Sequence, residues 1–127
     1  MLQTISVDIT TDGSGAATVE LKPGLNRNPT GLIVSFKYTP GTIVTGADLT
    51  ITGKDSGIPI LTVTNAGASN VWWYPRALAN EVADAAAASS GSEWIPIDDE
   101  PVQVVVAQGG ATKAGSIEVT LLTQAPY

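Results

Sequence analysis

Few side chains in this sequence could perform covalent chemistry. Its 127 residues include no histidine and no cysteine. Histidine is the commonest general base, and Ser-His and Cys-His pairs are the usual activated nucleophiles. Zinc sites rely mainly on His and Cys, and iron–sulfur clusters and disulfides need Cys. The composition therefore argues against an enzyme, and we expect no catalytic residue and no bound cofactor.

The other candidates for chemistry are carboxylates. Asp98-Asp99-Glu100 is a cluster of three acidic residues, and Ca²⁺ takes several oxygen ligands. The alternating acidic positions and distal Glu of an EF-hand loop are missing, so the cluster is interpreted as a solvated turn, with a metal site kept as the alternative. A small glycosidase or deacetylase-like enzyme is a rival hypothesis that requires two carboxylates facing each other in a cleft.

The most distinctive side chains are aromatic. Trp72, Trp73 and Tyr74 are consecutive, and Arg76 follows closely. On a strand, Trp72 and Tyr74 point to one face and Trp73 to the other, so at least one ring is expected in the core. Trp, Tyr and Arg are enriched in interface hot spots. We predict the following partner-binding residues: Trp72, Trp73, Tyr74 and Arg76. The alternative is a carbohydrate-binding surface, which would need these rings and Trp94 exposed in a row.

Charge and length narrow the classes of partner. Six basic and twelve acidic residues give a net charge of −6, which argues against nucleic-acid binding. Purely apolar runs such as residues 85–88 reach only four residues, far too short to span a membrane, and residues 1–4 lack the basic and apolar regions expected of a signal peptide. Charged residues make up 14% of the chain against a usual value of about 25%, which favours a surface that is easily desolvated in an assembly. The length predicts one domain, residues 1–127.

Alternation of apolar and polar residues with period two is the dominant pattern along the chain. Asp-Gly and Ser-Gly pairs in residues 11–15 tolerate positive φ, so residues 4–10 and 17–22 are predicted to form a hairpin. Pro59 places its strand at a sheet edge or at the strand's first position. Further strands are predicted at 32–38, 49–52, 58–64, 71–74, 94–97, 102–107 and 117–121.

One stretch lacks strand character. Leu78, Val82 and Ala86 recur every four residues, and the alanines of residues 85–88 are strong helix formers. We therefore predict a short helical excursion near residues 77–88. The whole pattern predicts an all-β fold: an antiparallel β-sandwich, jelly-roll-like, of about eight strands.

Several segments are similar to small virion structural proteins of tailed bacteriophages, which are encoded near the major capsid protein. The resemblance covers most of the chain from about residue 30 onward, and its most specific parts are Tyr-Pro-Arg and Val-Val-Ala-Gln-Gly-Gly. The segments are FKYTPGT at 36–42, GADLTIT at 46–52, WYPR at 73–76, DEPVQVVVAQGG at 99–110 and KAG at 113–115.

The resemblance implies a capsid decoration, or cement, protein. Such a protein binds the outer shell and stabilises contacts between major capsid protein subunits. The implied partners are the major capsid protein and further copies of the chain, as a dimer or trimer. The implied location is the capsid surface of the virion, after synthesis in the host cytoplasm. A head–tail connector, a neck or tail structural protein and a carbohydrate-binding module on the virion are the alternatives.

Overall fold

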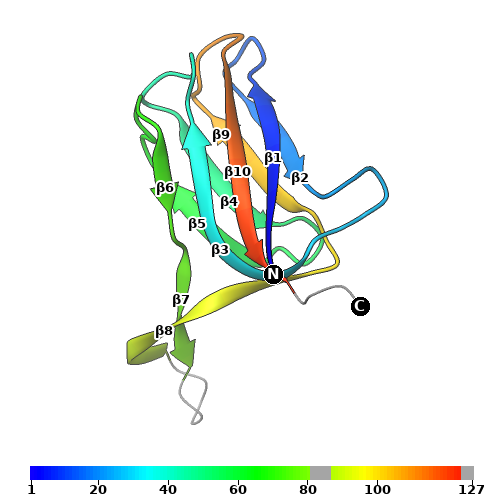
Figure 1. The fold of residues 1–127 in the computed structure, drawn as a ribbon. Helices are drawn as coiled ribbons and strands as arrows, with labels where there is room; N and C mark the ends of the chain where they lie inside the picture. Colours follow the sequence, from blue (N-terminus) through cyan, green and yellow to red (C-terminus); the bar gives the residue numbers. More distant parts are fainter. Residues whose placement is uncertain (81–86, 124–127) are drawn as a thin grey trace.

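The chain forms two antiparallel β-sheets. The computed structural model describes residues 1–80 and 87–123, and within these ranges every regular element is a strand (Figure 1). The strands are β1 (Leu2–Thr10), β2 (Ala17–Leu21), β3 (Thr30–Thr39), β4 (Asp48–Gly53), β5 (Pro59–Val63), β6 (Val71–Trp73), β7 (Arg76–Asn80), β8 (Ala87–Asp98), β9 (Val102–Ala107) and β10 (Ala114–Leu122).

One sheet has the order β1-β10-β3-β8-β7, with β6 also paired to β3, and the other has the order β2-β9-β4-β5. Every strand pair is antiparallel. The predicted all-β, antiparallel architecture is confirmed, and the described strands number ten rather than about eight. Pro59 is both the first residue of β5 and part of an edge strand, as its missing N–H requires.

The core lies between the sheets and follows from the period-two pattern. In β9, Val102, Val104 and Val106 are fully buried, whereas Val105 is exposed. Ile117 and Val119 of β10 come from the opposite sheet and are equally buried. β-Branched side chains stand perpendicular to a pleated sheet, so two such faces can interdigitate without polar atoms between them.

The predicted β1–β2 hairpin is wrong, although its turn is present. β1 pairs with β10 and β2 pairs with β9, so the turn crosses from one sheet to the other. Asp12 Oδ1 accepts the N–H groups of Ser14 and Ala16 at 2.8 and 3.0 Å, and these bonds lower the pKa of Asp12, Ala16 most strongly. Gly109 donates its N–H to the Gly15 carbonyl at 2.8 Å. The alternation identified both strands correctly but carried no information about which strands pair.

The helical excursion predicted near residues 77–88 is also wrong where the chain is described. Residues 77–80 belong to β7 and residues 87–88 to β8, while residues 81–86 lie outside the described residues. Leu78 pairs with Ser92, and Asn80 with Ala87. A short helix with a narrow apolar stripe is marginal in water, whereas an antiparallel partner strand supplies backbone hydrogen bonds directly.

Thr11 connects the turn after β1 to the turn between β9 and β10. It is buried, with 2% of its surface exposed. Its hydroxyl donates to the Gly110 carbonyl at 2.6 Å and accepts the Lys113 N–H at 2.7 Å. Thr11→Val keeps the side-chain shape but removes both bonds. We expect the free energy of unfolding in urea to fall by about 1–3 kcal/mol.

The matched control is Thr10→Val, at the exposed neighbouring position. It should change the free energy of unfolding by less than about 0.5 kcal/mol. Equal losses in the two variants would show that the Thr11 hydroxyl does not hold the corner together.

Candidate interaction site

The aromatic residues of β6, and Tyr74 directly after it, divide between core and surface. Trp73 is half-buried and stacks on Tyr38 of β3, with ring centroids 5.4 Å apart and an interplanar angle of 17°. Trp72 and Tyr74 expose 52% and 64% of their surface. The predicted alternation of side chains is therefore confirmed: Trp73 packs inward, and Trp72 and Tyr74 face solvent.

Two cations fix the orientation of the neighbouring rings. Lys37 Nζ lies 5.1 Å from the centroid of the Trp72 ring, on the strand that pairs with β6. The Arg76 guanidinium lies 4.5 Å from the centroid of the Trp94 ring, and the two residues are direct partners in the β7–β8 ladder. Cation–π contacts of this kind contribute about 0.5–1 kcal/mol at exposed sites. Each contact therefore favours the observed orientation of its ring.

Arg76 is also bonded to the backbone. Its Nη1 donates to the carbonyl oxygens of Pro75 at 2.7 Å and Val34 at 3.1 Å. Sequence reasoning named Arg76 as a partner-binding residue but did not find its contact with Trp94, because the two residues lie 18 positions apart and only the strand register brings them together. We call Trp72, Tyr74 and Arg76 the aromatic edge.

β7 and β8 form a ribbon that extends beyond the two sheets (Figure 1). Residues 95–98 of β8 pair with β3, whereas the preceding residues of β8 pair with β7. We call residues 76–80 and 87–94 the arm. Leu78 and Trp94 expose 57% and 40% of their surface. A two-stranded ribbon without a second layer is marginally stable by itself, and the arm leaves these two apolar side chains exposed to solvent.

The acidic cluster has a structural role at one of its three residues. Asp98 and Asp99 are exposed, but Glu100 is buried. Glu100 Oε1 accepts the N–H groups of Asp55 at 2.8 Å and Ser56 at 2.9 Å. Hydrogen bonds from Ser56, and then from Asp55, hold the pKa of Glu100 below its usual value. Across residues 1–80 and 87–123, no three acidic side chains are grouped closely enough to hold a metal ion.

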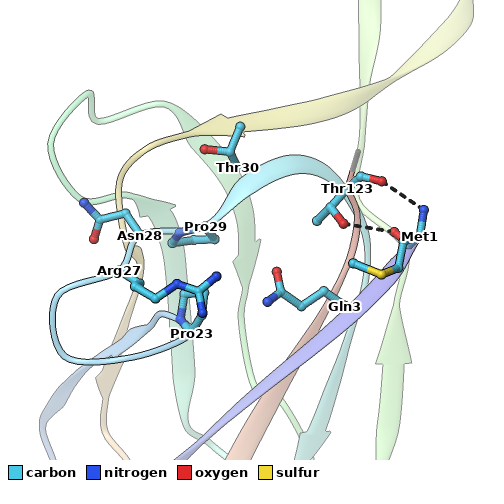
Figure 2. Close-up of a pocket in the computed structure, with 8 residues that line it drawn as sticks. All are labelled: Met1, Gln3, Pro23, Arg27, Asn28, Pro29, Thr30 and Thr123. Carbon is cyan, nitrogen blue, oxygen red and sulfur yellow. Dashed lines mark hydrogen bonds between the residues drawn. The ribbon is translucent and has the colours of Figure 1, made fainter. Parts of the chain in front are cut away.

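A pocket of about 250 Å³ lies beside the first residue of the chain. Figure 2 shows Met1 and Thr123 at its rim: the Met1 amino group donates to the Thr123 carbonyl at 2.9 Å, and the Thr123 hydroxyl donates to the Met1 carbonyl at 3.2 Å. Arg27 gives the pocket a positive charge, but Arg27 and Asn28 are exposed to solvent. The lining residues are Met1, Gln3, Pro23, Arg27, Asn28, Pro29, Thr30 and Thr123. We assign no ligand to it.

Comparisons with known proteins leave the family open. No family model matches the chain, and no curated protein matches it significantly. The chain is similar in structure to a solved protein titled "Crystal Structure of FLHE", with 12% sequence identity, 97% of each chain covered and a TM-score of 0.44. A likeness this distant carries no argument about function. The described residues also contain no helix long and apolar enough to cross a membrane.

The Glu100 contacts predict a pH-dependent stability. A lowered folded-state pKa means that the ionised carboxylate stabilises the fold above the ordinary value of 4.5, and that this contribution disappears as the pH falls through the folded value. Glu100→Gln keeps an acceptor oxygen but removes the charge. We expect the variant to have a lower Tm than the wild type at neutral pH.

The two Tm values should converge as the pH is lowered well below 4.5, followed by circular dichroism. Asp99→Asn is the control, because Asp99 is exposed and has a positive φ of 50° that Asn tolerates. It should leave Tm nearly unchanged at each pH. A Glu100→Gln difference that stays constant across the titration would contradict the role of the Glu100 charge.

Proposed function

We propose that this chain is a structural protein of a tailed-bacteriophage virion, and specifically a capsid decoration protein. It binds the outer shell and stabilises contacts between major capsid protein subunits. The aromatic edge carries this proposal: Trp72 and Tyr74 are exposed, and Lys37 lies over the Trp72 ring. A large ring whose orientation is already favoured loses little entropy on binding, and exposed Trp and Tyr side chains are typical of interface hot spots.

The contacts of the rings favour a protein partner over a sugar. Carbohydrates bind proteins by stacking on open aromatic faces, and Lys37 already lies over the Trp72 ring. Arg76 lies over the Trp94 ring in the same way. A protein partner can instead bury the ring edges and the Tyr74 side chain together with the neighbouring cations. A glycan-binding role is therefore the second candidate, and it is tested below.

The strand order supports a jelly-roll connectivity for the sandwich. The pairs are nested along the chain: β1 with β10, β2 with β9, β3 with β6 and β8, and β4 with β5. A long antiparallel ribbon of nested pairs, folded over onto itself, forms two sheets with the connectivity of two Greek keys. We propose that the arm is an insertion into this ribbon between β6 and the return of the chain to β3.

The proposed mode of action is mechanical. Each copy makes a limited contact through the aromatic edge, and many copies act together on one shell. Joined contacts of this kind gain strength through effective concentration rather than through a single tight site. A low charge content helps, because little polar surface must be desolvated at each contact.

The proposal predicts that the double variant Trp72→Ala/Tyr74→Ala loses binding to shells of the major capsid protein. Co-sedimentation should show at least about a tenfold weaker apparent affinity, because two exposed rings each carry about 1 kcal/mol or more when they act as hot spots. Val105→Ala is the matched control, since Val105 is an exposed apolar residue on the outer face of the other sheet. It should bind as the wild type does.

Three results would change the conclusion. Binding that survives the double variant would remove the aromatic edge from the interface. Glycan binding that the double variant abolishes, without any shell binding, would favour the carbohydrate-binding module. A cryo-EM count of about a dozen copies at one vertex, rather than hundreds over the shell, would favour a neck or tail component.

A further inference from the structure

A row of apolar side chains crosses the outer face of the larger sheet. The strand register places Leu2 of β1 opposite Leu122 of β10, Leu122 opposite Leu32 of β3, and Leu32 opposite Pro96 of β8. The three leucines expose 64%, 39% and 37% of their surface, and Pro96 is exposed as well. Partners in an antiparallel ladder point to the same face, so the four side chains form one continuous row.

The row continues onto the arm. Trp94 lies two residues before Pro96 on β8 and therefore points to the same face. Leu78 pairs with Ser92, which lies two residues before Trp94, so Leu78 shares this face too. Figure 1 shows that the start of β1, the end of β10 and the start of β3 lie at the end of the sheet from which the arm extends. We call this set the basal stripe: Leu2, Leu122, Leu32, Pro96, Trp94 and Leu78.

Polar side chains separate the stripe from Trp72, the other exposed apolar residue of this face in these ladders. The next row consists of Thr4, Thr120 and Ser35, and the row beyond it contains Glu118, Lys37 and Trp72. A charged residue, Arg76, lies beside the stripe as the partner of Trp94. The exposed apolar surface of these ladders is thus divided between the basal stripe and Trp72.

We propose that the basal stripe is covered by the basal stripe of a second copy of this chain. The exposed parts of its six side chains amount to roughly 500–600 Å², the upper range for the largest apolar patch on an ordinary monomer. A standard interface buries about 800 Å² per partner, so the stripe with its polar margin is of the size that a stable dimer needs. The inference rests on the proposed function, for which the resemblance to virion proteins implies a dimer or trimer, and it names the face that forms the contact between copies.

The basal stripe is complementary to itself, which favours a second copy of the chain as its binding partner. A two-fold interface packs the same patch against itself. Because the stripe contains no acidic residue and the partner of Trp94 is the cation Arg76, it can pair with itself although each chain carries a net charge of −6. A two-fold axis near Leu32 and Pro96 places Leu78 and Trp94 of each arm over Leu2 and Leu122 of the partner copy. Each arm then gains the second layer that it lacks within its own chain.

Sedimentation equilibrium of the full chain tests the proposal. The wild type should be a reversible dimer, and Leu32→Glu should raise its Kd at least about tenfold, because two like charges then meet near the axis. Val105→Glu adds the same charge on the opposite sheet and should dimerise as the wild type does. Leu122→Lys is the second stripe variant and should weaken the dimer as well. Urea unfolding of each variant confirms that it folds.

Mixing Leu32→Glu with Leu32→Lys provides the positive test. Opposite charges near the axis should restore dimers that neither variant forms alone. A wild type that stays monomeric up to millimolar concentration, or a folded Leu32→Glu with unchanged Kd, would overturn the proposal; so would the absence of rescue in the mixture.

The shell-binding assay separates this inference from the proposed function. A monomeric wild type that still binds shells through Trp72 and Tyr74 would overturn the basal-stripe dimer alone. A wild-type dimer that binds no shell would support the dimer and remove the decoration role.

Discussion

Two different strands, β6 and β8, pair with the same edge of β3 and leave residues 34–35 between them. The rest of the surface depends on the interaction that Arg76 makes at these residues. β6 pairs with residues 36–38 of β3, and β8 pairs with residues 30–33. Between them the register with β10 shifts, and Val34 has no partner in that ladder. The Arg76 guanidinium donates to the Val34 carbonyl at 3.1 Å, so a side chain contacts the backbone of β3 between the two partner strands.

At residues 34–35, this edge of β3 is contacted by the Arg76 side chain rather than by a partner strand, and the chain leaves the sheet there to form β7. A continuous partner strand would have held residues 71–98 flat against β3. Instead, β6 ends at Trp73, Arg76 turns the chain outward, and β8 returns to β3 at Ile95. Trp72 and Tyr74 come before this departure point in the chain, and the arm begins at it with Arg76. The two proposed contact surfaces therefore follow from one interruption in one strand pairing.

Local patterns predicted the parts of this structure that local physics determines. Alternation located the buried faces of β1, β9 and β10 and the division between Trp73 and its neighbours, because the period of a strand is set residue by residue. Pairing partners could not be predicted, so a corner between sheets was interpreted as a hairpin. The alanine-rich stretch was interpreted as a helix, because propensity carries no knowledge of a partner strand. The contacts of Arg76 with Trp94 and of Glu100 with Ser56 join distant segments and left no pattern in the sequence.

Two separate surfaces on one small chain have a consequence for assembly. If one surface served both self-association and shell binding, the two events would compete for the same side chains. The aromatic edge and the basal stripe share no residue, although Arg76 over Trp94 connects them. A dimer joined through the stripe would present two aromatic edges at a fixed separation, so its second contact with a shell would form at high effective concentration. In the proposed decoration role, rigid spacing between two weak contacts is what would hold neighbouring capsid subunits together.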